Sequence, residues 1–210
     1  MEILRKLNDT ELKTAYDQVF REAFPPAELK PLASMRRLQA EGHYDILGYF
    51  RDGEAQAYIC CWRREPFVLI DYLCVERAAR NGGIGARLLR IAQETYAPGT
   101  VFIGEVEAPT GNADADGLIL RRLDFYKRCG ARNAGYNCAL FGVVYRTIYW
   151  AEQELPAEEI LRNHDIFYRQ NFTPELYDRA IQLPLKEGEQ PFDRSAWNEK
   201  SASEGEIDEL

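Results

Sequence analysis

An apolar strand that leads into a glycine-rich turn and a helix is the feature that most constrains this chain. Residues 67–75 (FVLIDYLCV) are apolar at both odd and even positions, which predicts a central strand covered on both faces. The run Ala79-Arg-Asn-Gly-Gly-Ile-Gly85 follows, and we expect an amphipathic helix from there to about Tyr96. The first turn of such a helix presents unpaired N–H groups and a positive dipole end, so this segment can hold a phosphate group.

Two common phosphate-binding motifs do not fit this turn. A P-loop needs Gly-Lys followed by Ser or Thr, and that sequence does not follow here. A dinucleotide-binding fingerprint needs G-x-G-x-x-G, whereas the run from Gly83 places Leu88 where the third glycine belongs. The sequence therefore weakens the hypothesis of a nucleotide-binding oxidoreductase.

A third motif does fit the turn. The spacing Arg80-x-x-Gly83-x-Gly85 matches Q/R-x-x-G-x-G/A, and over about residues 1–150 the sequence resembles the GNAT superfamily of acetyl-CoA-dependent N-acetyltransferases. The resemblance implies a mixed α/β fold, in which a central, mostly antiparallel and splayed sheet carries helices on both faces. The alternative is an ordinary strand-to-helix connection whose glycines only allow the chain to turn.

The resemblance also implies how acetyl-CoA is bound. Backbone N–H groups of the turn would cradle the pyrophosphate, and the arginine would add donors. The residues of this cradle are Arg80, Asn81, Gly82, Gly83, Ile84 and Gly85. Main-chain groups of Leu73 and Val75 would pair with the pantetheine arm, and an N–H group within Leu73, Cys74 and Val75 would hold the oxyanion that forms on the thioester.

A tyrosine near the end of a later helix is the candidate acid. The segment Phe125-Tyr-Lys-Arg-Cys-Gly130 resembles the Y-x-x-x-G-F ending of many GNAT enzymes, although Ala131 stands where Phe is usual and Ile119 where many carry Asn. By resemblance, Tyr126 would protonate the departing thiolate of coenzyme A. The alternative is a half-buried aromatic residue that only packs on the sheet.

The candidate base lies on the strand expected over Val101 to Glu107. Alternation places Glu105 and Glu107 on one face of that strand. The segment Ile-Gly-Glu105-Val resembles the Leu-Glu-Val segment of GNAT enzymes that acetylate peptide N-termini, where the glutamate acts as base. Glu105 is therefore the first choice for the base, and Glu107 or Asp71 is the second.

The other expected elements follow from turn residues and periodicity. We expect a strand at 2–7, helices at about 10–20 and 32–40, a hairpin of 46–50 and 55–62 around Asp52-Gly53, a polar loop at 109–117, a helix at 118–129, and mostly strand at 133–150. Two further helices should begin near Pro156 and at Thr173-Pro174.

The domain organisation predicted from these elements has three parts. Residues 1–150 would form the GNAT core, residues 151–185 a helical extension packed on the core, and residues 186–210 an acidic, disordered tail. The net charge of -8 belongs to the C-terminal parts, because residues 1–150 hold 20 Lys and Arg against 19 Asp and Glu. The acidity therefore says nothing about a cationic substrate, and it disfavours nucleic-acid binding. Arg80, Arg87 and Arg90 are expected to cluster where the anionic coenzyme lies.

Cysteine and histidine counts argue against a metal site. The five cysteines form no Cys-x-x-Cys pair and the chain has two histidines, so we expect neither zinc nor a disulfide framework. The apolar runs are far shorter than the roughly 20 residues of a membrane span. The first residues lack the features of a secretory signal, so a cytoplasmic protein is expected.

The resemblance to the GNAT superfamily implies direct transfer of an acetyl group from acetyl-CoA to a primary amine of a small molecule or peptide. The alternative is a non-catalytic acyl-CoA-binding or interaction module with the same fold.

Overall fold

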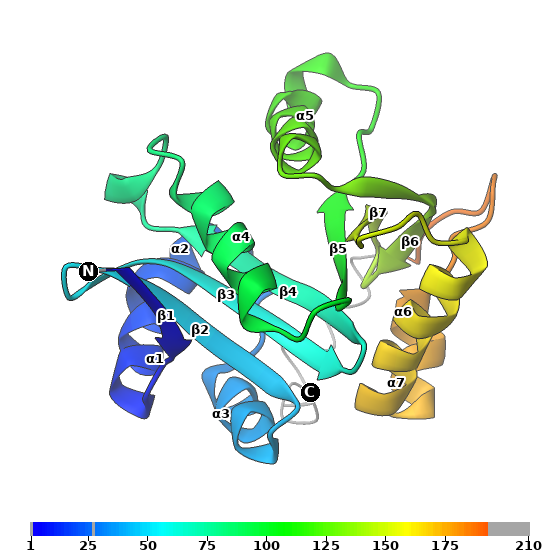
Figure 1. Cartoon of the computed structure of the whole chain (residues 1–210). Coiled ribbons are helices and arrows are strands. Elements are labelled where there is room, and N and C mark those ends of the chain that lie inside the picture. Colours follow the sequence, from blue (N-terminus) through cyan, green and yellow to red (C-terminus); the bar gives the residue numbers. More distant parts are fainter. Residues whose placement is uncertain (1, 27, 193–210) are drawn as a thin grey trace. The chain divides into compact units, whose positions relative to one another are not determined.

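The computed structural model describes residues 2–26 and 28–192 of the chain (Figure 1). The chain divides into two compact units, of which the first ends at Pro98 and the second begins at Gly99. This division falls inside the predicted core rather than at residue 150, and the predicted domain boundaries stay a prediction. In the described part of the chain, no helix is long and apolar enough to cross a membrane.

The first unit contains an antiparallel sheet in the order β1-β2-β3-β4. Its strands are β1 (Glu2–Lys6), β2 (Tyr44–Arg51), β3 (Glu54–Arg64) and β4 (Phe67–Val75). The expected hairpin around Asp52-Gly53 is confirmed, and both residues adopt the positive φ angles (53° and 91°) that a tight two-residue turn needs. Strand β4 has the bounds predicted from its apolar run, and most of its residues are buried.

The helices of the first unit also follow the sequence signals. They are α1 (Asp9–Ala15), α2 (Arg21–Ala23), α3 (Leu32–Glu41) and α4 (Ile84–Thr95), together with a π turn at Tyr16–Phe20 and a 3-10 turn at Arg77–Ala79. The π turn interrupts the helix expected through Phe20. Helix α3 ends at Gly42, whose φ of 84° is the left-handed conformation that glycine adopts readily. Helix α4 packs against β3 and β4.

The second unit contains an antiparallel sheet in the order β5-β7-β6-β8. Its strands are β5 (Val101–Glu107), β6 (Arg132–Leu140), β7 (Val143–Trp150) and β8 (Ile181–Gln182). Strands β6 and β7 form a hairpin that turns at Phe141 and Gly142, which both have positive φ angles. The predicted strand at 101–107 is confirmed, whereas the two-residue β8 was not expected.

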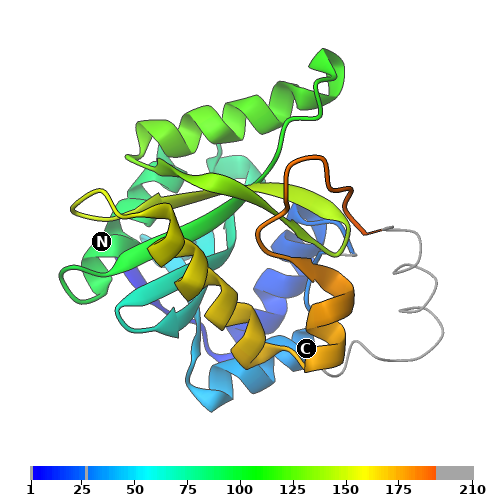
Figure 2. The ribbon, with the colours of Figure 1, turned by 90° about the vertical axis from the view of Figure 1, so that its right-hand side faces the viewer.

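Three helices accompany this sheet among the described residues: α5 (Ala113–Arg128), α6 (Ala157–Asn171) and α7 (Pro174–Ala180). Helices α5 and α6 lie on opposite faces of the β6–β7 hairpin (Figure 2). The starts predicted near Pro156 and at Thr173 are confirmed, and the Thr173 hydroxyl accepts a hydrogen bond from the Leu176 N–H at 3.3 Å.

The prediction of a polar loop over residues 109–117 is wrong in its second half, because α5 begins at Ala113 and includes Gly117. The Asp116 carboxylate accepts hydrogen bonds from the N–H groups of Thr110 and Gly111, both at 2.8 Å. The Asn112 side chain accepts one from the Asp114 N–H at 3.1 Å. These polar residues thus stabilise the start of a helix, since they satisfy backbone N–H groups around its first turn.

The segment after β8 returns to that strand. The Gln182 side chain donates to the Gln190 carbonyl at 3.1 Å and accepts from the Phe192 N–H at 2.9 Å. Residues 186–192 of the predicted tail therefore have defined hydrogen bonds, and residues 193–210 lie outside the described residues.

Candidate functional site

The glycine-rich turn connects β4 to α4 through a tightly folded backbone. Asn81 and Gly83 have positive φ angles of 66° and 74°. Gly83 is the N-cap of α4, and no side chain caps the helix there. A Cβ atom added to Gly83 would meet no atom within 4 Å, so this corner of the turn opens outward. The first-turn N–H groups of α4 are thus presented without a side-chain acceptor, as a phosphate cradle requires.

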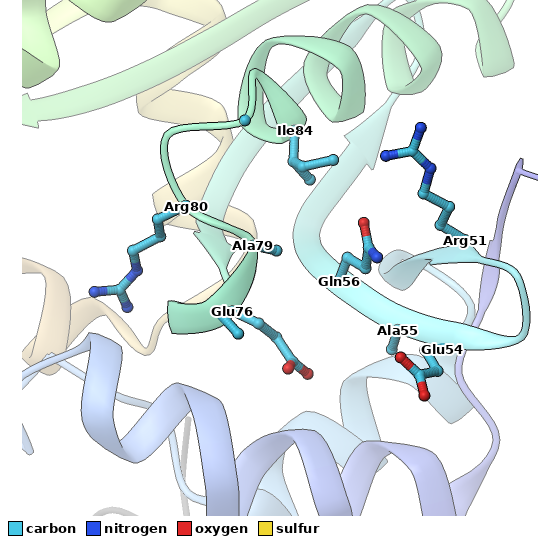
Figure 3. Close-up of a pocket in the computed structure, with 10 residues that line it drawn as sticks. Arg51, Glu54, Ala55, Gln56, Glu76, Ala79, Arg80 and Ile84 are labelled. Carbon is cyan, nitrogen blue, oxygen red and sulfur yellow. The ribbon is translucent and has the colours of Figure 1, made fainter.

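A cavity of about 330 Å³ lies beside this turn in the first unit (Figure 3). Residues of the β2–β3 hairpin and of the turn line it: Arg51, Glu54, Ala55, Gln56, Glu76, Ala78, Ala79, Arg80, Gly82 and Ile84. Figure 3 shows the side chains of Gln56 and Ile84 directed toward its interior, whereas the Arg80 guanidinium points away from it. Its two arginines are balanced by two glutamates, so the cavity as a whole is not a cationic site.

Three arginines were expected to cluster near the coenzyme, and their partners differ. Arg87 forms an ion pair with Glu2, and Arg90 forms one with Glu94 at 2.7 Å. The Arg80 Nε atom instead donates to the Val75 carbonyl at 3.1 Å. This bond does not neutralise the Arg80 charge, so Arg80 remains suited to an anion, whereas the charges of Arg87 and Arg90 are balanced by carboxylates.

The end of β4 presents main-chain groups on the side away from β3. The Glu76 N–H donates to the Gln56 carbonyl at 2.9 Å, so the hydrogen-bonding groups of Glu76 face β3. Because these groups alternate along a strand, those of Val75 and Leu73 face the other way. Burial raises the pKa of the intervening Cys74 thiol to about 12, which keeps it protonated.

A β-bulge marks the middle of β4. Cys60 pairs with Tyr72 and Cys61 with Ile70, which leaves Asp71 without a residue opposite. Both carboxylate oxygens of Asp71 accept hydrogen bonds from the Lys30 ammonium at 2.9 Å, and the Tyr44 hydroxyl also donates to this carboxylate. Asp71 is therefore occupied by a cation of its own chain.

Glu105 lies on β5 among side chains of the second unit, and 11% of its side chain is exposed. Its Oε1 atom is 2.8 Å from the His164 Nε2 atom, and the Tyr168 hydroxyl donates to both carboxylate oxygens at 2.8 and 2.9 Å. The Cys138 thiol approaches Oε1 at 3.5 Å. The alternative Glu107 is instead paired with Arg122 at 2.6 Å.

His164 and Tyr168 were not identified from the sequence. Both belong to α6, four residues apart and hence on one helix face. His164 is fully buried, and its Nδ1 atom is 3.1 Å from the Tyr136 hydroxyl of β6. The available signal was weak: a histidine and a tyrosine at helical spacing are equally compatible with ordinary packing.

Tyr126 lies on α5 and packs edge-to-face on Trp150, with ring centroids 5.7 Å apart. Trp150 pairs with Phe102 across β5 and β7, whereas Glu105 pairs with Thr147. Since side chains alternate along a strand, Trp150 and Glu105 occupy opposite faces of this sheet. Tyr126 and Glu105 thus lie on opposite faces of this sheet. The aromatic packing considered for Tyr126 is present, and its catalytic role stays a prediction.

All five cysteines are free thiols. In the part of the chain that the structure describes, no group of three or more His, Cys, Asp or Glu side chains is arranged to hold a metal ion.

Comparisons with known proteins place this geometry in a family. The sequence model of the Acetyltransferase (GNAT) family matches residues 10–131. YjbC of Bacillus subtilis (strain 168), assigned as an acetyltransferase, is 30% identical over an alignment of 147 residues, and the alignment covers 67% of this chain and 72% of YjbC.

Solved structures agree in fold. A protein from Bacteroides thetaiotaomicron assigned to the GNAT family matches with a TM-score of 0.64 and 21% identity, over 79% of this chain and 94% of that one. An aminoglycoside 6'-N-acetyltransferase complexed with coenzyme A matches with a TM-score of 0.52 and 12% identity, over 73% and 99%. The predicted fold class, a mixed α/β fold with mostly antiparallel strands, is confirmed.

Proposed function

Because the chain belongs to the GNAT family of acetyltransferases, we propose that it transfers the acetyl group of acetyl-CoA to a primary amine of a small molecule or peptide. Family membership makes the chain an acyltransferase. The observation that carries the proposal is the geometry of the turn from Arg80 to Gly85. Gly83 is the N-cap of α4, and no side chain caps the helix there. The aminoglycoside acetyltransferase of the same fold, which binds coenzyme A, supports both the donor and the amine acceptor.

The coenzyme would be held by main-chain groups of the first unit. The pyrophosphate would accept hydrogen bonds from the turn formed by Arg80, Asn81, Gly82, Gly83, Ile84 and Gly85, where the helix dipole favours negative charge. The pantetheine arm would follow Leu73 and Val75. The direction of their main-chain groups, away from β3, supports this assignment, and the Val75 carbonyl accepts the hydrogen bond of the Arg80 Nε atom.

The chemistry needs a base, an oxyanion donor and an acid. Glu105 would remove a proton from the acceptor ammonium, and the free amine would attack the thioester carbon. An N–H group within Leu73, Cys74 and Val75 would stabilise the oxyanion, and Tyr126 would protonate the coenzyme A thiolate as the C–S bond breaks. Acid and base steps contribute about 10²- to 10⁴-fold each in enzymes.

Ion pairing supports the choice of Glu105 over the other carboxylates. Asp71 holds the Lys30 ammonium and Glu107 holds the Arg122 guanidinium, so either carboxylate would have to give up an ion pair to take a proton from the acceptor. Glu105 instead accepts hydrogen bonds from side chains that can be neutral.

Thiol release from acetyl-CoA tests this function. The protein is mixed with acetyl-CoA and a panel of alkylamines, polyamines, aminoglycosides and peptides, each compared with its N,N-dimethyl counterpart, which cannot form a stable amide. We expect thiol release with at least one primary amine and none with its counterpart. Acetyl-CoA binding without turnover on any amine would favour the non-catalytic module, and absence of binding would overturn the proposal.

A further inference from the structure

A buried histidine, His164, contacts the proposed base Glu105. The chain has two histidines, of which His43 is exposed and His164 is fully buried in the second unit. A buried imidazole needs hydrogen-bond partners for both ring nitrogens, because an unsatisfied polar atom in the interior is costly. His164 has such partners in Glu105 and Tyr136.

The donors in this cluster can be assigned from its chemistry. An ionised carboxylate only accepts hydrogen bonds, so the His164 Nε2 atom, 2.8 Å from Glu105, must carry the proton. The Nδ1 atom of the neutral ring then accepts from the Tyr136 hydroxyl at 3.1 Å. A hydroxyl can also accept, so the Tyr136 oxygen can receive a bond from Nδ1–H if the ring becomes protonated.

We propose that His164 is a positioning residue for Glu105. Its neutral imidazole keeps Glu105 in place as the base, and protonation of the imidazole inactivates this base by forming an imidazolium–carboxylate pair. The inference rests on the proposed function, in which Glu105 accepts the proton of the acceptor ammonium. An imidazolium in contact with the carboxylate lowers the proton affinity of Glu105, so the amine is no longer deprotonated.

Few other described side chains near the His164–Glu105 pair could titrate near neutral pH. The titratable side chains that face the pair are Tyr136 and Cys138 from β6 and Tyr168 from α6. Burial raises the pKa of Tyr136 and of Cys138, so both stay protonated near neutral pH. Thr147 of β7, whose hydroxyl donates to the Cys138 sulfur at 3.8 Å, does not titrate.

Charged groups nearby on these elements are directed elsewhere. On α6, Asp165 is bound by Arg169 and by the Tyr177 hydroxyl of α7. On β7, Arg146 pairs with Val106, which places it on the opposite face of the sheet from Glu105. On β5, Glu107 is bound by Arg122 of α5.

Glu105 lies inside the part of the chain that the family model matches, whereas its partners lie outside it. That match ends at residue 131, and Tyr136, His164 and Tyr168 follow it. The contacts of His164 and Tyr168 to Glu105 are therefore supplied by helix α6.

Nuclear magnetic resonance of the two imidazole rings tests the pairing without any substrate. In the wild-type protein, His164 should show the neutral tautomer with a protonated Nε2 at high pH. In Glu105→Gln, the His164 ring should become protonated only at lower pH than in the wild type, because the attraction of a carboxylate is lost. His43 serves as the internal reference and should not shift. An unchanged His164 midpoint would overturn the proposal.

The pH dependence of kcat/KM tests the catalytic consequence. His164→Gln keeps an N–H donor for Glu105 but carries no titratable group. We expect the acid limb of the profile to move to lower pH, because no imidazole is left to become protonated beside Glu105. The control His43→Gln should leave the profile unchanged. Tyr168→Phe removes one donor to Glu105 and should lower kcat without moving the limb.

The outcomes separate this inference from the proposed function. If the wild type acetylates amines and His164→Gln has an unchanged acid limb, the inference is wrong and the function stands. If no amine is acetylated, the proposed function fails and the imidazole titration still decides whether the pair is coupled. If His164→Gln does not fold, the titrations of the wild type and of Glu105→Gln give the answer.

Discussion

At the scale of single residues, Tyr126 has two roles: its ring packs on Trp150, and its hydroxyl group is the proposed proton donor. Only the second role requires the hydroxyl oxygen. Tyr126→Phe keeps the ring on Trp150 and removes only the hydroxyl. We expect kcat to fall about 100-fold, with little change in the KM for acetyl-CoA or in the melting temperature. Steady-state kinetics and thermal unfolding measure these quantities. A kcat equal to that of the wild type would remove Tyr126 from the mechanism.

A matched control for this substitution is available in the first unit. The Tyr96 hydroxyl donates to Asp45 at 3.1 Å, so Tyr96→Phe also removes one phenol oxygen from a hydrogen bond. This variant should lower the melting temperature and leave kcat unchanged, which is the reverse of the pattern expected for Tyr126→Phe.

The buried Lys30–Asp71 ion pair allows the assignment of the base to be tested. The two side chains are 12% and 16% exposed, and removal of one partner from such a pair costs about 3 kcal/mol. We expect Asp71→Asn to be destabilised and the double variant Lys30→Met, Asp71→Asn to recover part of that stability. Denaturant unfolding measures both.

The kinetics of the same variants decide between the carboxylates. The double variant should retain kcat within about threefold, whereas Glu105→Gln should lose about 100-fold. The opposite ranking would make Asp71 the base.

At the scale of elements, the start of α4 depends on a glycine with a positive φ angle. Gly83 and Gly99 have similar φ angles of 74° and 81°, and a Cβ atom would have open space at both positions. Alanine should therefore destabilise the protein by about 1 kcal/mol at either site. Only Gly83→Ala should also raise the KM for acetyl-CoA, because only Gly83 belongs to the proposed phosphate cradle. Equal KM values for the two variants would contradict the cradle.

The capping box of α1, formed by Asn8 and Glu11, leads to a second prediction at this scale. The Glu11 carboxylate accepts hydrogen bonds from Arg5 and from the Asn8 N–H, and these bonds lower the pKa of Glu11 to about 2. A depressed carboxyl pKa contributes stability that is complete above about pH 4.5 and is lost as the pH falls toward 2. Since 28% of the Glu11 side chain is exposed, solvent screening limits the effect to about 1 kcal/mol.

Glu11→Gln should therefore be less stable than the wild type by about 1 kcal/mol at pH 7, and the difference should disappear near pH 2. Denaturant unfolding across this pH range at fixed salt measures the difference. A constant difference at every pH would show that the charge of Glu11 is not involved.

Elements with local signals could be predicted from the sequence. The Asp52-Gly53 turn, Gly42 and Thr173-Pro174 each act on their own neighbours, and the structure confirms the hairpin, the helix end and the helix start that they indicated. The early start of α5 could not be predicted by the same means, because it depends on the Asp116 side chain reaching back to Thr110 and Gly111.

The residues of the candidate site also differ in whether the local sequence could indicate them. The turn from Arg80 to Gly85 is contiguous, so its residues could be selected from a motif as the candidate phosphate cradle, and that role stays a prediction. His164 is 59 residues away from Glu105, and only the packing of α6 on the sheet brings the two side chains together. No periodicity or motif in the sequence encodes that contact, because it depends on tertiary packing.

At the scale of the whole molecule, the second unit depends on a segment beyond the expected core. Helix α6 packs against β6 and buries Ile160, His164 and Phe167, which are at most 2% exposed. Full burial of each large apolar side chain contributes about 1.5–3 kcal/mol. The C-terminal extension therefore both covers the sheet and supplies His164 and Tyr168, which contact Glu105.

Two truncations test this dependence. A chain that ends at Trp150 lacks α6 and α7. We expect it to lose cooperative unfolding because one face of its sheet is no longer covered. We also expect it to lose acetyl transfer because Glu105 no longer contacts His164 and Tyr168. A chain that ends at Phe192 is the matched control, since it lacks six acidic and two basic residues but keeps every described contact of α6. It should keep kcat and a melting temperature within about 2 °C of the wild type. Circular dichroism and thiol release measure both chains. If the shorter chain retained full kcat, Glu105 would need no partner from α6, and the extension would serve another purpose.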